Sequence, residues 1–524
     1  MDTGGTFTDF AWEHEGVLRT LKVSSSPKDP AQAVLEGLNE AGVLAGPIDL
    51  VHGSTVGTNT LLEHRGGRVA FLTTRHFEDV LDIGRQSRAQ LYNLTPERPE
   101  SLVPPHMRRG ITERMAASGE VIEALTPEEI NSACEWLAQL KPDAVAIGLL
   151  HSYANDAHER ALADAVRERV GCPVSVSRDV LPEMREFERF STTVANAYLQ
   201  PVVSRYFDRL GTDIQGRLRV MQSSGGAISF TLAAAEPIRT VLSGPAGGVS
   251  GAWEWAKAAG YDKILTFDMG GTSTDVSHYA GTFEREFETQ VAGVRMRAPM
   301  MSIHTVAAGG GSLLGFDGAR FRVGPESAGA NPGPASYRRG GPLAVTDANV
   351  MVGKIQPAHF PRVFGHAANE PLDGDVVALK FGALAGQTGR RAEDVAHGFI
   401  QIAVQQMANA IKKISVARGY DVTRYTLQCF GGAGGQHACL VADALGMQQV
   451  LVHPLAGVLS AYGMGLADQN VIREQAVESP LTEAALPAVQ AALDALAEAA
   501  RADLARQQAP GGAVALHRRV HVRY

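Results

Sequence analysis

Cysteine is scarce in this chain, and its spacing is uninformative. Four cysteines occur in 524 residues, and none of them forms a CxxC pair. This spacing excludes a disulfide framework and a cysteine-rich zinc module. We therefore expect that the protein is cytoplasmic and that its thiols are buried and reduced. The thiols belong to Cys134, Cys172, Cys429 and Cys439.

Long apolar runs and an excess of positive charge are also lacking. No run approaches the ~18–20 apolar residues that span a bilayer, and the residue after Met1 already belongs to a motif, so we expect no secretory leader. The formal net charge is −8 and the isoelectric point about 6.1. These values disfavour nucleic acid or a membrane surface as a partner.

Two common catalytic signatures do not occur in the sequence. No HExxH pattern occurs, and His52, His151, His304 and His437 belong to no HxxxH pattern, so these histidines do not suggest a zinc site. Without a GxSxG string, a serine nucleophile of the hydrolase type is not expected.

One aspartate–glycine motif occurs twice, far apart in the chain. Residues 2–9 read DTGGTFTD and residues 268–275 read DMGGTSTD, which differ at two positions. A carboxylate at a strand end can hold hydrated Mg²⁺, and adjacent glycines let backbone N–H groups approach an anion. A glycine-rich turn would explain one copy, but two copies favour a duplicated domain that grips a polyphosphate.

Alternating strand and helix patterns predict an α/β fold with a largely parallel sheet. A central strand is expected at Ile264–Phe267, followed by a hairpin of Val276–Ala280 and Phe283–Phe287. Long helices are expected over 183–210, 392–418 and 481–508, and residues 513–524 alternate like a strand. The Gly/Pro-rich stretch 324–341 is expected to be a loop, typical of a lid or a subunit contact.

The paired loops resemble the phosphate loops of the actin, sugar kinase and heat-shock ATPase superfamily. Their DxGGTxTD spelling is most similar to the hydantoinase A / 5-oxoprolinase family, which includes acetone- and acetophenone-type carboxylase subunits. Further strings carry this resemblance in the same order: HGSTVGTN, DIGRQSR, LSGPAGG, IHTVAAGGGS, VGPESAGANPGPASY, TDAN and FGGAGGQHA.

The resemblance implies duplicated ribonuclease-H-like (actin-like ATPase) domains that face each other across a nucleotide cleft. The expected divisions are 1–210 for the first half, 211–475 for the second half, and 476–524 for a helix and the start of a C-terminal β-rich domain. Since no strand precedes Asp2 and the final run has nothing to pair with, we expect that the chain is truncated at both ends.

The resemblance also implies roles for individual residues. Asp2 and Asp268 would hold the metal and orient the phosphates of ATP. The phosphate contacts would come from Gly4, Gly5, Thr6, Gly270, Gly271 and Thr272, and the adenosine-side loop from Gly431, Gly432, Gly434 and Gly435. Tight helix–strand packing is the alternative explanation for the last four glycines.

Other candidates carry two interpretations each. Asp9 and Asp275 could act as a general base or metal ligand, or could cap their turns. Arg85 and Arg88 could clamp a carboxylate or phosphate, or form surface ion pairs. A further group of polar residues comprises Ser54, Thr55 and Asn59. These residues are positioned where a substrate could enter, although helix capping is the favoured interpretation.

The function implied is ATP- and Mg²⁺-dependent ring opening of a cyclic amide, such as a hydantoin or 5-oxoproline, by phosphorylation of the amide oxygen. The family usually pairs such an A-type subunit with a B-type subunit in a hetero-oligomer. One alternative is a carboxylase subunit that phosphorylates a ketone or bicarbonate. A second alternative is a non-catalytic, actin-like nucleotide-binding module.

Overall fold

The computed structural model describes residues 1–4, 7–26, 29–87, 92–95, 100–365, 367, 369–507 and 513–522. The chain forms two compact units, each assembled from separate stretches of sequence. Unit 1 comprises Met1–Ser25, Gly244–Arg285 and Met301–Ala467. Unit 2 comprises Ser26–Ser243, Glu286–Met300 and Asp468–Tyr524. The linear division at residues 210 and 475 stays a prediction.

Unit 1 is built on a five-stranded sheet with the order β17-β14-β13-β20-β21. Its central strand β13 pairs antiparallel with β14 and parallel with β20, so the sheet is mixed. The strands of unit 1 are β1 (Asp2–Thr3), β2 (Phe7–His14), β3 (Val17–Ser24), β13 (Lys263–Met269), β14 (Thr274–Ala280), β17 (Ile303–Val306), β18 (Ser312–Phe316), β19 (Phe321–Ser327), β20 (Thr426–Phe430) and β21 (Gln449–Val452). The central strand predicted at Ile264–Phe267 is confirmed.

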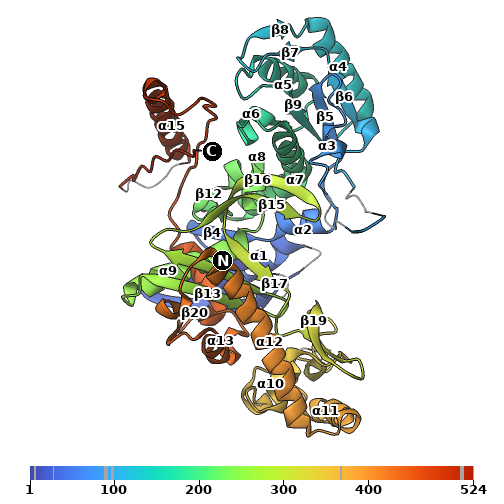
Figure 1. The fold of residues 1–524 in the computed structure, drawn as a ribbon, viewed down its shortest axis with the longest axis vertical. Coiled ribbons are helices and arrows are strands. Elements are labelled where there is room, and N and C mark those ends of the chain that lie inside the picture. Colours follow the sequence, from blue (N-terminus) through green and yellow to red (C-terminus); the bar gives the residue numbers. More distant parts are fainter. Residues whose placement is uncertain are drawn as a thin grey trace. The chain divides into compact units, whose positions relative to one another are not determined.

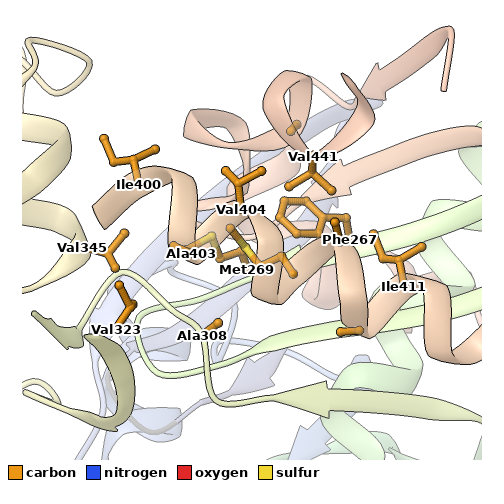
Figure 2. Packing of buried hydrophobic residues seen from close by; sticks show 14 of the residues in the cluster. Phe267, Met269, Ala308, Val323, Val345, Ile400, Ala403, Val404, Ile411 and Val441 are labelled. Atoms are coloured by element: carbon orange, nitrogen blue, oxygen red, sulfur yellow. The ribbon is translucent and has the colours of Figure 1, made fainter. Parts of the chain in front are cut away.

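The main core of unit 1 lies between this sheet and α12. Its helices are α9 (Ser243–Ala258, in unit 1 from Gly244), α10 (Val345–Met351), α11 (Gly374–Thr388), α12 (Ala392–Ile414), α13 (Ala438–Leu445) and α14 (Leu459–Gly465). Alternate residues of β13 point toward α12, so Phe267 and Met269 lie among Val404, Ile411 and Val441, all buried (Figure 2). The neighbouring Asp268 therefore points to the opposite face of the sheet, because strand side chains alternate.

Glycines allow α9 and α14 to pack at backbone contact. A Cβ added at Gly251 would lie 2.8 Å from the Gly463 Cα, and one added at Gly463 would lie 2.2 Å from the Gly247 carbonyl oxygen. Gly247 and Gly251 are one helical turn apart and face the same neighbour. Gly247 of the LSGPAGG segment and Gly251 thus serve close helix packing.

Two sequence predictions in unit 1 need correction. The hairpin expected from 276–280 and 283–287 is reduced to a single bridge between Tyr279 and Phe283, because β14 instead pairs with β13 and β17. The stretch 324–341 begins within β19 rather than in a loop. The buried Asp347 carboxylate accepts hydrogen bonds from the backbone N–H groups of Ala335 (2.9 Å), Ser336 (2.9 Å) and Ala344 (2.8 Å), which fixes this stretch.

Unit 2 contains a parallel sheet with the order β10-β9-β5-β6, flanked by α4 and α5 (Figure 1). The strands of unit 2 are β4 (Ile48–Ser54), β5 (Val69–Thr74), β6 (Arg108–Ile111), β7 (Arg114–Met115), β8 (Val121–Glu123), β9 (Ala144–Gly148), β10 (Val174–Val176), β11 (Gly216–Met221), β12 (Ala227–Ser229), β15 (Arg285–Val291) and β16 (Val294–Met301). Parallel strands of this kind are buried on both faces, and β9 is entirely buried.

The helices of unit 2 begin where the sequence signals them. Thr126 caps α4, and its side-chain oxygen accepts a hydrogen bond from the Glu129 N–H at 3.3 Å, as the capping pattern predicts. The helices are α1 (Pro30–Glu40), α2 (Val56–Leu62), α3 (Val80–Ile83), α4 (Pro127–Leu140), α5 (Ala157–Arg169), α6 (Ser177–Val180), α7 (Glu186–Asp213), α8 (Phe230–Ala235) and α15 (Leu486–Arg506). Among the described residues, none of the helices combines the length and apolar character needed to cross a bilayer.

Candidate active site

The two repeated motifs form two hairpins with the same register, both in unit 1. In the first, β1 pairs with β2 so that Asp2 stands opposite Asp9. In the second, β13 pairs with β14 so that Asp268 stands opposite Asp275. The turn of each hairpin is closed by an equivalent hydrogen bond. The Gly4 N–H donates to the Phe7 carbonyl at 3.0 Å, and the Gly270 N–H donates to the Ser273 carbonyl at 3.0 Å.

The carboxyl groups of the two hairpins lie close enough to repel one another. Burial raises the pKa of Asp268 well above its usual value, and the charges of Asp275, Asp2 and Asp9 raise it further. Burial and the charge of Asp9 raise the pKa of Asp2 to about 7, although the Met1 ammonium and Lys22 oppose this shift. The charges of Asp2 and Asp9 thus act on Asp268 although more than 250 residues separate the two segments, which supports the convergence that the repeated motif predicts.

The first and second aspartates of each motif differ in their partners. The Asp9 carboxylate accepts a hydrogen bond from the Lys22 ammonium, and the Asp275 carboxylate accepts one from the Thr305 hydroxyl at 2.5 Å. The Asp2 and Asp268 side chains have no hydrogen bond or ion pair with a described residue. The first aspartates are therefore the ones available to a ligand, whereas the second are held by neighbouring strands.

The second hairpin is enclosed by two further glycine loops. Gly431 has a φ of +83°, and a Cβ there would lie 2.3 Å from Asp268 Oδ1, so only glycine fits. A Cβ on Gly434 would lie 2.8 Å from the Cys429 sulfur, which supports the packing interpretation for that residue. Gly432 and Gly435 have open space where a Cβ would stand.

The other loop is Ala307–Gly311. The Gly310 N–H donates to the Gly270 carbonyl at 3.1 Å, and the Gly311 N–H donates to the Gly271 carbonyl at 2.6 Å. These bonds fix the turn that follows Asp268. Sequence reasoning missed this role, although three consecutive glycines were a sign that two backbones approach closely.

The start of α9 was also missed as part of the site. A Cβ on Gly244, the second residue of α9, would lie 3.7 Å from Asp2 Oδ1. The free N–H groups of a helix N-terminus favour negative charge nearby. The LSGPAGG string signals this helix start, but no spacing rule links it to Asp2.

The predicted substrate residues lie in unit 2. The Ser54 hydroxyl accepts a hydrogen bond from the Val56 N–H at 3.2 Å, and the Asn59 amide donates to the Thr55 hydroxyl at 3.4 Å. Arg85 donates from Nε to the buried Glu188 carboxylate at 2.5 Å. The Ser54 and Arg85 contacts agree with the capping and ion-pair alternatives, whereas Thr55, the N-cap residue of α2, makes no capping hydrogen bond with its side chain. Gly5, Thr6 and Arg88 fall outside the described residues, so the structure leaves their predicted roles as predictions.

The acidic side chains at the starts of the two motifs suit a magnesium ion. The described residues hold no group of three or more His, Cys, Asp and Glu side chains arranged for a metal. Magnesium needs fewer protein ligands, because it usually binds one or two carboxylates together with substrate phosphates and water. Asp2 and Asp268 supply two hard oxygen ligands whose mutual repulsion a cation would relieve. The residues present therefore fit a nucleotide-bound Mg²⁺.

Comparison with known proteins assigns the family. The family model described as hydantoinase/oxoprolinase matches residues 189–473, and the model for the N-terminal region of the same family matches residues 1–170. The chain belongs to the hydantoinase/oxoprolinase family. The 5-oxoprolinase of Saccharomyces cerevisiae is 37% identical over 530 residues, covering 89% of this chain and 41% of the yeast protein. This member of the family thus spans about two fifths of the length of that curated relative.

Solved structures of relatives share the fold. The ATP-dependent caprolactamase of Pseudomonas jessenii superposes with a TM-score of 0.85 at 31% identity, covering 97% of this chain and 76% of that chain. In sequence, the caprolactamase subunit alpha of the same organism is 33% identical, covering 89% of this chain and 70% of the relative. A nucleotide-free acetone carboxylase structure gives a TM-score of 0.73 at 27% identity, covering 96% and 76%.

Proposed function

We propose that this protein catalyses the ATP-dependent ring opening of a cyclic amide, of the hydantoin or 5-oxoproline type, as the A-type subunit of its enzyme. The observation that carries the proposal is the convergence of two twin hairpins whose first aspartates are free to meet a ligand. The names of the relatives, a 5-oxoprolinase and an ATP-dependent caprolactamase, support a cyclic amide as the substrate.

ATP is needed because an unstrained amide carbonyl is a poor electrophile. Transfer of the γ-phosphoryl group to the amide oxygen forms an imidate phosphate and leaves ADP. Water then adds to the imidate carbon, and the tetrahedral intermediate expels the ring nitrogen, which takes a proton, so that the ring opens and leaves an acyl phosphate. A second water hydrolyses the acyl phosphate to a carboxylate and inorganic phosphate. The products are ADP, phosphate and the ring-opened amino acid.

The chain would contribute position and charge neutralisation rather than covalent chemistry. Asp2 and Asp268 would hold Mg²⁺, which when bound neutralises phosphate charge. The backbone N–H groups of Gly271 and Thr272 and the Thr272 hydroxyl would contact the phosphates, whereas the Gly4 N–H closes its own turn. Gly432 and Gly435, which have open space beside their Cα atoms, would line the adenosine side. Asp9 and Asp275 would keep the hairpins in register through Lys22 and Thr305.

Several broader features belong to the same proposal. We infer duplicated actin-like ATPase halves, a cytoplasmic location and a hetero-oligomer with a B-type subunit. The description of the caprolactamase relative as a subunit alpha supports the partner. Separate expression and mixing with a B-type subunit, followed by size-exclusion chromatography, would test the association.

The decisive experiment measures ADP release with 5-oxoproline, hydantoin or caprolactam, alone and with a B-type subunit. We expect one cyclic amide to stimulate ATP hydrolysis and to yield its ring-opened product in equal amount. Nucleotide binding without stimulation by any amide or ketone would instead indicate a non-catalytic module.

A second candidate is an ATP-using carboxylase subunit, which the similarity to acetone carboxylase favours. In that reaction the phosphoryl group would go to a ketone or to bicarbonate. Parallel assays with acetone and acetophenone, with and without bicarbonate, separate the two. Stimulation that requires bicarbonate would support the carboxylase and contradict the amidohydrolase.

A further inference from the structure

A hydrogen bond between two buried side chains joins α10 to the glycine loop beside Asp268. The Asn349 amide nitrogen lies 3.1 Å from His437 Nε2, and both side chains are fully buried. Asn349 lies in α10, whereas His437 follows the glycine loop and precedes α13. The strings TDAN and FGGAGGQHA, which are far apart in the sequence, therefore meet at this bond.

The contacts of Asn349 determine which imidazole nitrogen of His437 carries the proton. The amide nitrogen also donates to the Val345 carbonyl at 3.1 Å. A carbonyl oxygen only accepts hydrogen bonds, so the donor end of the amide faces both partners, and His437 Nε2 accepts. The proton of the neutral ring is then on Nδ1. Burial and nearby Lys354 lower the pKa of His437 to about 4, so the ring is neutral at physiological pH.

The loop that precedes His437 is attached to the turn after Asp268. The Ala433 N–H donates to the Met269 carbonyl at 2.9 Å. The His437 N–H donates to the Gly434 carbonyl at 3.0 Å, so the position of the histidine is linked to the turn within the loop. A shift of His437 would therefore move the backbone that surrounds Asp268.

The same helix also supports the loop Ala307–Gly311. Thr346 donates to the Gly310 carbonyl from its backbone N–H (2.7 Å) and from its hydroxyl (2.9 Å), and the Gly310 N–H donates to the Gly270 carbonyl at 3.1 Å. Both α10 and α13 pack on α12 in the main core of unit 1. Helix α10 is thus a rigid support from which Thr346 and Asn349 hold the two glycine loops.

The pair of Asn349 and His437 is poorly suited to a purely structural role. Asn349 Oδ1 and His437 Nδ1 are buried and have no hydrogen bond with a described residue. Buried polar atoms without partners reduce stability, and apolar side chains of similar shape avoid this cost. The pair instead supplies a directional bond, which selects one conformation of the glycine loop.

We propose that His437 and Asn349 are positioning residues for nucleotide binding, which hold the loop 431–436 in its ligand-binding conformation beside Asp268. This inference rests on the proposed use of ATP. A loop that is held in place before binding loses less conformational freedom when the nucleotide binds, so the affinity is higher. Neither side chain has to touch the nucleotide for this effect.

Isothermal titration of the full chain with Mg²⁺ and adenylyl imidodiphosphate, a non-hydrolysable ATP analogue, tests the proposal. His437→Leu and Asn349→Leu each remove the bond and should weaken binding by about tenfold. Because both changes break the same bond, the double variant should bind about as weakly as either single variant. His437→Gln can place its amide oxygen as an acceptor near the Nε2 position, and its affinity should stay within about threefold of that of the native chain.

Tyr425→Phe is the matched control for a loss of stability. The Tyr425 hydroxyl shares a buried hydrogen bond of 2.9 Å with His278 Nε2, at the end of β20 away from the glycine loop. Its removal should lower the melting temperature but change the nucleotide affinity by less than about twofold. The melting temperature of every variant is measured, and Asn349→Leu carries the test if His437→Leu does not fold.

Several results would each overturn the proposal. They are native affinity in the two leucine variants, equal weakening in His437→Gln and His437→Leu, equal weakening in Tyr425→Phe, and a double variant whose loss equals the product of the two single losses. A native chain that does not bind the analogue would reject the proposed use of ATP and this inference with it. The two failures are distinguishable, because only the second abolishes binding to the native chain.

Discussion

At the scale of single residues, the two aspartates that begin the motifs differ from every other carboxylate near them. The charge of Asp2 acts on Asp268, the pKa of each of the two carboxyl groups is raised, and neither side chain has a partner among the described residues. A folded chain keeps such repelling groups only at a cost in stability, which is typical of functional sites. Their replacement should therefore affect activity and stability in opposite directions.

Asp268→Asn tests this expectation. ATP turnover should fall by about 100-fold or more because the metal loses a ligand, while the melting temperature should stay the same or rise because a buried repulsion is removed. Steady-state ADP release and thermal unfolding measure the two effects. Asp394→Asn, at an exposed position of α12, is the matched control and should leave both unchanged. Undiminished turnover in Asp268→Asn would remove the metal-holding role.

Gly431→Ala should destabilise the protein by about 2 kcal/mol or more, because φ is positive and the new Cβ would meet the Asp268 carboxylate. Chemical denaturation measures the change in the free energy of unfolding. Gly382→Ala, in the interior of α11 with open space around it, is the control and should stabilise the protein by up to about 1 kcal/mol. Equal effects of the two substitutions would contradict the close approach at Gly431.

At the scale of elements, Asp347 holds together a stretch that looks like a free loop in the sequence. Its carboxylate accepts three backbone N–H groups from positions 335, 336 and 344. Buried donors that lose their acceptor cost about 1–3 kcal/mol each. Order in this stretch therefore depends on one side chain.

Asp347→Ala should lower the free energy of unfolding by about 3 kcal/mol or more, since three buried N–H groups lose an acceptor together. Urea denaturation gives the value, and limited proteolysis should cut between residues 328 and 344 in the variant only. Asp375→Ala, in the first turn of α11, is the control and should cost less than about 1 kcal/mol. Resistance to proteolysis in Asp347→Ala would contradict this role.

Local signals predicted the elements that depend on nearby residues. The cap at Thr126, the long helix beginning at Ala392 and the strand that ends in Asp268 follow from the sequence because propensity, capping and periodicity act over a few positions. The hairpin expected from Val276–Ala280 and Phe283–Phe287 is not formed, because β15 pairs with β16 instead. Residues 513–522 were expected to be a strand but form none, because strands need a pairing partner.

The candidate site was predicted to a similar extent. The repeated motif predicted that its aspartates converge, since a duplicated spelling is visible in one sequence. The contributions of Gly244 and of Gly309–Gly311 were missed, because contacts between distant backbones leave no periodic pattern. For Arg85, the sequence left a substrate clamp and an ion pair open, and the partner Glu188 became visible only in the structure.

At the scale of the whole molecule, each unit buries a histidine in neutral form. Burial lowers the pKa of His52 in unit 2 from 6.5 to about 3, and burial with nearby Lys354 lowers the pKa of His437 in unit 1 to about 4. Below pH 6.5 these two histidines bind protons in the unfolded chain but stay neutral in the folded chain. Their contribution to stability is thus complete above pH 6.5 and is lost as pH falls toward 4.

Between pH 6.5 and 4, each histidine should remove up to about 3 kcal/mol from the free energy of unfolding. His52→Gln can keep the hydrogen bond to Tyr206, and it should lessen the pH dependence relative to the native chain. Denaturation curves at several pH values provide the slopes. His397→Gln, exposed on α12, is the control, and a slope in His52→Gln equal to that of the native chain would contradict the prediction.

The assembly of unit 1 from Met1–Ser25, Gly244–Arg285 and Met301–Ala467 has a consequence for biosynthesis. The first hairpin leaves the ribosome before the other two segments of unit 1 have been synthesised. At about 5–20 residues per second, the interval between the synthesis of the first hairpin and that of the other segments of unit 1 amounts to tens of seconds. During that time Asp2 and its neighbours remain open to chaperones, so unit 1 can be completed only after the segment that ends at Ala467 has been synthesised.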